Sequence, residues 1–195
     1  MIASPSFLTP EEYFDWEAAQ PERHEYFDGA TYAMAGGTLA HGRIGLNISA
    51  FLNAQVRSRQ CLTFNSDCRV GISEAGPFTY PDVSVSCDER DRTAQQFIQH
   101  PCLIVEVLSA STEAYDRGRK FELYRQLPSL QEYMLVGSET KTVELFRRDE
   151  AGAWRFFVYG EGHEVTLASV GVTLSVDQIY ADVAIAPLGG VQLLS

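Results

Sequence analysis

Asp82, Glu106 and Lys120 are the residues of this chain whose types and order could support chemistry on a phosphate. Each carboxylate stands in a short strand-like run, and the lysine follows on a segment with a helical pattern. Carboxylate oxygens are hard ligands that suit Mg²⁺ or Mn²⁺ better than zinc. A divalent cation and a neighbouring ammonium group could together stabilise the charge that develops on a phosphate during hydrolysis.

Glu106 lies in the run Leu103–Leu108, whose length and β-branched content are typical of a buried strand. Successive side chains of a strand point to opposite faces, so Glu106 should share its face with Ile104 and Leu108. An ionised carboxylate among apolar side chains is costly unless a cation, a hydrogen-bond donor or water reaches it. The sequence therefore predicts a partner for Glu106.

Asp82 opens a second strand-like run, which ends at Ser86. The preceding Tyr80-Pro81 favours an extended backbone, because proline disfavours the helical region for the residue before it. A Pro-Asp pair is also a common turn, and Glu106 could be a strand-end carboxylate bonded to nearby amides. The lysine that follows them on a predicted helix makes the two acids together stronger candidates than either acid alone.

Lys120 belongs to a predicted helix that begins near Ser109–Thr112 and is ended by Pro128. Its helical neighbours at intervals of three or four residues form one face, which includes Glu113, Asp116, Lys120, Tyr124 and Leu127. Tyr124 and Leu127 are natural core residues, so this face is expected to turn toward the sheet. Gly118 weakens the helix locally.

Four segments resemble the Uma-two family of restriction-type endonucleases, within the PD-(D/E)xK nuclease superfamily. The segments are HEYFDG at 24–29, YPDVSVS at 80–86, LIVEVLSAST at 103–112 and DRGRKFELYRQLPSLQEYMLV at 116–136. The resemblance covers about residues 8 to 183. The superfamily lysine would fall at Leu108, whereas this chain carries Lys120 on the following helix, as the Uma-two family does.

The resemblance implies an α+β fold: a restriction-endonuclease-like core in which helices flank a mixed central β-sheet. It implies that Asp82, Glu106 and the backbone carbonyl of Val107 hold Mg²⁺ or Mn²⁺, and that Lys120 is the catalytic lysine. Glu25 would be an additional acid. The implied activity is hydrolysis of phosphodiester bonds in nucleic acid, with DNA as the favoured substrate and a homodimer or higher homo-oligomer as the assembly.

Two of the candidate residues also have simple structural explanations. Glu25 could be a cross-strand charge near Arg23 in a hairpin predicted over 24–34. His41 falls in the first turn of a helix over 38–58, which is predicted from the apolar stripe of Ile44, Ile48, Phe51, Leu52 and Val56. Thr38 precedes it as a cap, and a histidine at such a position is commonly solvated or locally bonded. The resemblance adds His41 only as an auxiliary group near the cleft.

Composition indicates one globular domain over residues 1–195. The span of the resemblance places its core at about 8–183, which leaves an apolar tail at 184–195. Hydrophobic residues make up 45% of the chain and its formal net charge is −11. That charge has the wrong sign for non-specific attraction to DNA. We find no signal-peptide pattern and no membrane-length apolar stretch, so a cytoplasmic protein without membrane contacts is expected.

The four cysteines have no CxxC spacing, and Cys61 and Cys68 lie in one strand-like alternation over 61–73. Free thiols are therefore expected. Further patterns predict a helix that starts at Pro10, strands over 131–137, 142–148 and 154–159, and a short helix over 175–180.

Two other classes of function remain open. One is a nuclease-like fold that serves as an oligomeric interaction module without catalysis. The other is a metal-dependent hydrolase of a small phosphorylated substrate, which suits the acidic composition better than DNA does.

Overall fold

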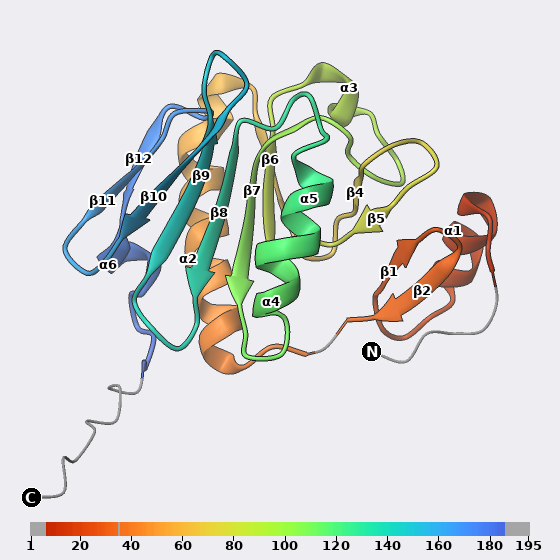
Figure 1. The fold of residues 1–195 in the computed structure, drawn as a ribbon, viewed down its shortest axis with the longest axis horizontal. Coiled ribbons are helices and arrows are strands. Elements are labelled where there is room, and N and C mark those ends of the chain that lie inside the picture. The colour runs from red at the N-terminus through yellow and green to blue at the C-terminus, as the bar shows by residue number, and fades with distance from the viewer. Residues whose placement is uncertain (1–6, 35, 186–195) are drawn as a thin grey trace, which may run out of the picture.

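A mixed six-stranded sheet forms the centre of the computed structural model, which describes residues 7–34 and 36–185 (Figure 1). Its neighbouring strands are antiparallel except β7 and β8, which run parallel. From edge to edge the strands are β10 (Trp154–Tyr159), β9 (Val143–Arg148), β8 (Glu132–Gly137), β7 (Pro101–Leu108), β6 (Val83–Ser86) and β3 (Leu62–Asn65).

Two smaller sheets and several helices surround this sheet. The four-stranded sheet has the order β2 (Ala30–Ala33), β1 (His24–Phe27), β5 (Phe78–Thr79) and β4 (Val70–Gly71), and the third sheet is β11 (Glu164–Leu167) with β12 (Val172–Ser175). The α-helices are α1 (Pro10–Ala18), α2 (Leu39–Val56), α3 (Glu89–Arg92), α4 (Glu113–Tyr115), α5 (Phe121–Tyr124) and α6 (Val176–Ile179). The 3₁₀-helix η1 (Arg57–Arg59) and the π-helix η2 (Asp116–Lys120) complete the set.

Helix α2 covers one face of the central sheet and the α4–η2–α5 segment covers the other (Figure 1). The predicted apolar stripe of α2 is confirmed, because Ile44, Ile48, Leu52 and Val56 are completely buried. They pack in one cluster with side chains of β11, β12 and α6, which lie on the same side of the sheet. This mixed sheet between helices confirms the predicted α+β fold.

Strand β7 follows the predicted alternation. Leu103, Val105 and Val107 belong to the cluster on the α2 side, and Ile104 and Leu108 belong to the cluster on the α5 side. Glu106 therefore points to the face that the α4–η2–α5 segment covers. A helical connection over that face is what a parallel β7–β8 pair requires.

The helix that carries Lys120 is shorter and less regular than the sequence predicts. It begins at Glu113, ends at Tyr124, and contains a π-helical stretch over Asp116–Lys120. Gly118 lies inside that stretch, where its weak helical preference lowers the cost of leaving the regular α geometry. Lys120 nevertheless faces the sheet, as predicted, and is buried.

The predicted N-terminal hairpin is present as β1 and β2, paired in antiparallel register. Asp28 and Gly29 form its two-residue turn, and both have positive φ, 47° and 92°. Such turns need two residues that tolerate positive φ, and Asp-Gly is a favoured pair. Thr9 caps α1 through a capping box with Glu12.

One predicted strand is wrong. The alternation over 61–73 is divided between β3 in the six-stranded sheet and β4 in the four-stranded sheet. Asn65 breaks it, because its side-chain oxygen accepts a hydrogen bond from the Asp67 amide and its carbonyl accepts one from the Cys68 amide. This Asx turn reverses the chain. Leu62 is exposed in consequence, whereas Val70 is buried.

The expectation of free cysteines holds for Cys68 and Cys102 and is wrong for the other two. Cys61 and Cys87 form a disulfide. They precede β3 and follow β6, whose antiparallel register pairs Leu62 with Ser86 and so brings the flanking cysteines together. Sequence spacing alone does not reveal this pairing.

The strands predicted over 131–137, 142–148 and 154–159 are present as β8, β9 and β10, and α6 is the predicted C-terminal helix. The β11–β12 hairpin between them was not predicted. Most of the expected apolar tail, residues 186–195, lies outside the described residues. Among the helices that the structure describes, none has the length and apolarity to cross a membrane.

Candidate active site

Lys120 lies at the centre of a group of buried carboxylates. Its Nζ atom is 3.0 Å from Glu106 Oε1, 3.3 Å from Glu25 Oε1 and 3.3 Å from Asp116 Oδ1. Each of these four side chains is at most 8% exposed. Burial alone would lower the pKa of Lys120, but the three carboxylates outweigh it and raise that pKa well above its usual value. The ammonium is therefore retained as a fixed positive charge.

Glu106 projects from β7 into this group. Its Oε1 atom accepts a hydrogen bond from Tyr124 Oη at 2.9 Å, in addition to the bond from Lys120. Tyr124 Oη in turn lies 3.1 Å from Thr79 Oγ1, which holds the phenol in place. Burial raises the pKa of Glu106 well above the ordinary range, against the charge of Lys120, and the neighbouring acids Asp116, Asp82 and Glu25 add to the rise. The partner predicted for Glu106 is thus an ammonium and a phenol together.

Asp82 precedes β6 and joins the site through the backbone of β7. Its Oδ2 atom accepts a hydrogen bond from the Val107 amide at 2.7 Å. The same oxygen is 3.4 Å from His41 Nε2 of α2. Hydrogen bonding to Asp82 raises the pKa of His41, burial opposes the rise, and the Val107 carbonyl adds to it. His41 therefore contacts Asp82, one of the three groups expected to hold a metal.

The conformation of His41 depends on the start of α2. Thr38 Oγ1 accepts a hydrogen bond from the His41 amide and fixes the first turn. A Cβ atom at Gly37 would lie 2.7 Å from His41 Nδ1, so only glycine leaves room for the ring there. The Gly-Thr pair before α2 thereby directs the imidazole to Asp82.

Glu25 reaches the site from β1 of the N-terminal hairpin. Besides Lys120, its carboxylate accepts long hydrogen bonds, both 3.5 Å, from the Tyr80 amide and Tyr115 Oη. Arg23, the partner in the simpler explanation, pairs instead with Asp67 at the surface. The structure therefore brings Glu25 to Lys120 and not to Arg23.

The sequence placed Asp116 on the same helix face as Lys120, but Asp116 was not selected as a site residue. Asp116 is buried, and its Oδ1 atom accepts no hydrogen bond among the described residues, although it lies near the Lys120 ammonium. Spacing of four from Lys120 on one helix is the signal that could have revealed it. Tyr124 was likewise interpreted only as a core residue.

These residues line a cavity of about 620 Å³. Its walls come from α2, the β1–β2 hairpin, the segment before β6, and the loop between β7 and α4. Gly42 and Gly45 of α2 belong to the lining, and a Cβ atom at either position would meet nothing within 4 Å. The cavity is therefore unobstructed along α2, and Lys120 and the carboxylates around it form its base.

The donors at the base of this cavity are oxygens of Asp82, Glu106 and the Val107 backbone, which suit a hard divalent cation. The described residues contain no group of three or more His, Cys, Asp or Glu side chains already spaced to hold a metal ion. Lys120 and Tyr124 hold one oxygen of Glu106, while the unsatisfied buried Asp116 oxygen marks surplus negative charge. The donor set therefore fits such a cation in chemistry.

A mixed central sheet between helices, with carboxylates at its central strands and a lysine on the helical segment that covers them, defines the restriction-endonuclease-like class of nuclease folds. Residues 10–177 match the Uma2 family model, described as "Putative restriction endonuclease", and the chain belongs to that family. This confirms the resemblance that the four segments indicated.

Two similar proteins come from Synechocystis sp. The uncharacterized protein slr1290 is 46% identical over 177 residues, which cover 91% of this chain and 93% of that protein. The uncharacterized protein sll1609 is 34% identical over 168 residues, which cover 85% and 95%.

A solved structure shares the fold. It is described as a putative nuclease belonging to DUF820 from Anabaena variabilis, and it superposes with a TM-score of 0.71. The match covers 89% of this chain and 97% of the other, at 20% sequence identity.

Proposed function

We propose that this chain is an endonuclease that hydrolyses phosphodiester bonds of DNA with the help of a divalent metal ion. The observation that carries the proposal is the contact of Lys120 with Glu106, Glu25 and Asp116 at the base of the cavity, beside Asp82. Membership of the Uma2 family supports the same reaction class.

In this proposal Asp82, Glu106 and the Val107 carbonyl hold Mg²⁺ or Mn²⁺. Once bound, the cation would supply Lewis-acid stabilisation of the charge on the scissile phosphate. Tyr124 orients Glu106 through its hydrogen bond, and the Val107 amide orients Asp82. His41 acts as an auxiliary group that helps to hold Asp82 in place, through the same oxygen that the Val107 amide binds.

Lys120 orients the attacking water or stabilises the negative charge that builds on the phosphate oxygens. Its pKa, raised by the three carboxylates, keeps it charged for this role at neutral pH. Glu25 reaches Lys120 from β1 and positions water or completes the ligand shell. The fixed contacts reduce the reorganisation needed during reaction.

Cleavage of supercoiled plasmid DNA with Mg²⁺ or Mn²⁺ tests the proposal. Asp82→Asn should abolish cleavage, while Asp15→Asn, the same change at an exposed residue of α1, should leave it unchanged. Equal rates in the two variants, or cleavage that persists in a chelator, would overturn the proposal.

The net charge of −11 favours a second candidate, the hydrolysis of a small phosphorylated substrate. Release of phosphate from mononucleotides without cleavage of oligonucleotides would select it. A catalytically silent interaction module is the third possibility, and a divalent-cation titration without any response would select that one.

The assembly in this proposal is a homodimer. Light scattering coupled to size-exclusion chromatography should then give twice the chain mass of 21.7 kDa. A mass of one chain at micromolar concentration would contradict it.

A further inference from the structure

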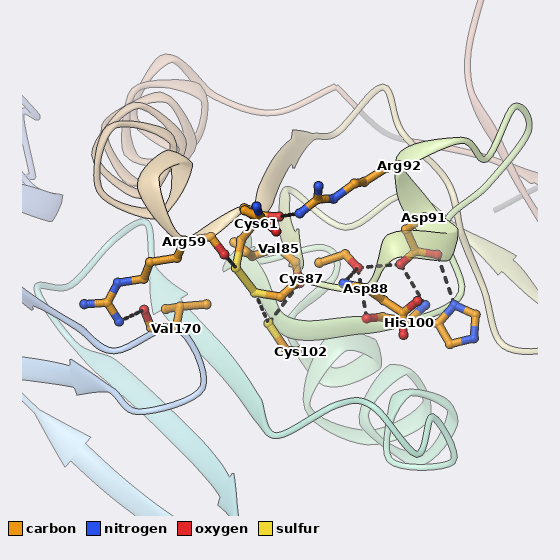
Figure 2. Close-up of a disulfide and its surroundings, with 12 residues drawn as sticks. Arg59, Cys61, Val85, Cys87, Asp88, Asp91, Arg92, His100, Cys102 and Val170 are labelled. Carbon is orange, nitrogen blue, oxygen red and sulfur yellow. Dashed lines mark hydrogen bonds and ion pairs between the residues drawn. A yellow bond between two sulfur atoms is a disulfide. The ribbon is translucent and has the colours of Figure 1, made fainter.

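Three cysteine sulfurs lie side by side across three neighbouring strands of the central sheet (Figure 2). Cys61 precedes β3, Cys87 follows β6, and Cys102 is the second residue of β7. Cys61 and Cys87 form a disulfide, and the free Cys102 Sγ lies 3.8 Å from Cys87 Sγ. Cys87 therefore has a second sulfur within contact distance of its disulfide.

The sheet register produces this arrangement. Strand β6 lies between β3 and β7, with Ser86 opposite Leu62 on one side and opposite Pro101 on the other. The ladder between β6 and β7 is irregular at Val85 and Ser86. Such an irregularity re-aims the side chains beside it. Cys87 therefore has a cysteine neighbour on both sides.

The three cysteine residues differ in their exposure to solvent. Cys87 is exposed, Cys102 is half-buried, and Cys61 is buried. Cys102 Sγ lies 3.4 Å from the Val85 carbonyl, to which its thiol donates. Cys61 Sγ lies 3.6 Å from the Arg59 carbonyl, which is an acceptor for a Cys61 thiol. Either buried partner can thus exist as a hydrogen-bonded thiol.

We propose that Cys61, Cys87 and Cys102 form a thiol–disulfide exchange site, in which Cys87 pairs alternately with Cys61 and Cys102. In the exchange, Cys102 sulfur attacks Cys87 sulfur, the Cys87–Cys102 bond forms, and the Cys61–Cys87 bond breaks. The proton lost by Cys102 is matched by the proton gained by Cys61, so no outside oxidant or reductant is consumed. Nucleophilic attack by a thiolate on a neighbouring disulfide sulfur is the ordinary route for such exchange.

The exposed Cys87 is also the entry point for an outside thiol of the low-molecular-weight class. Such a thiol attacks Cys87, expels Cys61 as a thiolate, and leaves a mixed disulfide on Cys87. Cys102 then attacks the same Cys87 sulfur and releases the outside thiol. The net result is the same change of partner.

Burial raises the pKa of Cys102 to about 11, which keeps it a protonated thiol at neutral pH and slows the exchange. The site lies at the end of β6 and β7 remote from Asp82 and Glu106, because the two strands are antiparallel. It therefore stands apart from the proposed nuclease function and does not depend on it.

Peptide mapping after alkylation of free thiols with N-ethylmaleimide tests the proposal. Trypsin separates Cys87 in residues 70–90 from Cys102 in residues 93–117, but leaves Cys61 and Cys68 together in residues 60–69. Cys68→Ser is therefore the reference protein, since it makes every linkage unambiguous. We expect this protein, treated with substoichiometric glutathione, to yield the 60–69/70–90 linkage and the 70–90/93–117 linkage. Absence of the second linkage would overturn the proposal.

A second protein tests the exchange without depending on how the disulfide is distributed between the Cys61–Cys87 and Cys87–Cys102 pairs. In Cys61→Ser combined with Cys68→Ser, glutathione disulfide should form a mixed disulfide on Cys87 that resolves to the Cys87–Cys102 linkage. Adding Cys102→Ser should abolish resolution, so that Cys87 stays glutathionylated. Persistent glutathionylation of Cys87 while Cys102 is still present would contradict the exchange.

Discussion

At the residue scale, the charge balance of the candidate site depends on Lys120. Within the described part of the chain it is the single cation in contact with three buried carboxylates, and a fourth, Asp82, adds to the negative charge felt by Glu106. Removal of one partner from a buried charge group leaves the others uncompensated. The site is therefore held together by the same residue that is proposed to act on the phosphate.

Lys120→Ala should lower both stability and activity. We expect a loss of roughly 3 kcal/mol in the free energy of unfolding, the scale for a broken buried ion pair, and a fall in cleavage rate of at least about a hundredfold. Thermal melts and plasmid cleavage measure the two effects. Lys141→Ala, which removes the exposed lysine beside Glu161, is the matched control.

Lys120→Arg should be little more active than Lys120→Ala, because the planar guanidinium does not replace a compact ammonium among three carboxylates. Divalent cations should recover part of the melting temperature of Lys120→Ala, since they supply positive charge to the same oxygens. Cleavage at the unmodified rate in Lys120→Ala would show that the lysine has only a structural role.

Divalent cations should raise the melting temperature of the unmodified protein through Asp82 and Glu106. A ligand that binds only the folded state stabilises by about 2.7 kcal/mol at a hundredfold excess over its Kd. Asp82→Asn should remove the increase with Mg²⁺ or Mn²⁺, whereas Asp15→Asn should retain it. Differential scanning calorimetry measures the shift in melting temperature. An unchanged shift in Asp82→Asn would show that the cation binds at a site without Asp82.

The reactivity of Cys102 should depend steeply on pH. Burial first, with the charge of Glu132 from β8, raises its pKa to about 11, and Cys87 is its sulfur neighbour. Below that pKa the thiolate fraction rises about tenfold for each pH unit. Alkylation of Cys102 by iodoacetamide should therefore accelerate about tenfold between pH 8 and pH 9. A rate that levels off near pH 8 would contradict the protected thiol.

At the element scale, regular patterns predicted the fold well and local turn chemistry limited the prediction. The stripe of Ile44, Ile48 and Leu52 revealed α2, and the alternation of β7 revealed the face of Glu106. The side-chain bond of Asn65 that ends β3 has no periodic signal, and the long alternation concealed it. Periodicity describes what an element buries, but it does not describe where the chain turns.

The sequence suggested the candidate residues, but it did not predict how they are arranged in space. Asp82, Glu106, Lys120 and Glu25 lie together, but no pattern indicated that the hairpin bearing Glu25 would reach Lys120. Asp116 was expected on the helix face that turns toward the sheet, but no pattern indicated that its carboxylate would lie against Lys120. Tertiary packing, which no local spacing encodes, decides these contacts.

Glu132 of β8 fastens the β11–β12 hairpin to the central sheet. Its fully buried carboxylate accepts hydrogen bonds from the amides of Ala168 and Ser169 and from Arg147 Nε. Glu132→Gln should reduce the free energy of unfolding by about 2 kcal/mol, the scale for hydrogen bonds to a charged group.

Urea denaturation measures the effect of Glu132→Gln, and Glu150→Gln in the exposed turn before β10 is the control. Because Glu132 lies outside the cavity, cleavage below the melting temperature should remain within a factor of two of the unmodified rate. A loss of cleavage without a loss of stability would assign Glu132 a part in the site that its contacts do not indicate.

At the scale of the whole molecule, charge opposes the proposed substrate. The chain has 15 basic and 26 acidic residues, and the carboxylates around Lys120 line the same cavity that would receive the phosphate. A duplex that approaches this surface gains little from counterion release, because nine of the fifteen basic side chains already form ion pairs with the protein's own acids. Affinity must then come from a divalent cation shared between protein and phosphate.

DNA binding should therefore depend on divalent cations and only weakly on monovalent salt. In EDTA at physiological salt, fluorescence anisotropy of a short labelled duplex should give a Kd no tighter than about 10⁻⁴ M, the weak limit of non-specific binding. Ca²⁺, which takes the same oxygen ligands, should tighten binding at least about tenfold in the unmodified protein and not in Asp82→Asn. The slope of log K against log salt should correspond to about one to three phosphates. Tight binding in EDTA with a steep salt slope would instead require a basic surface. The divalent cation would then not be the bridge between this acidic protein and its substrate.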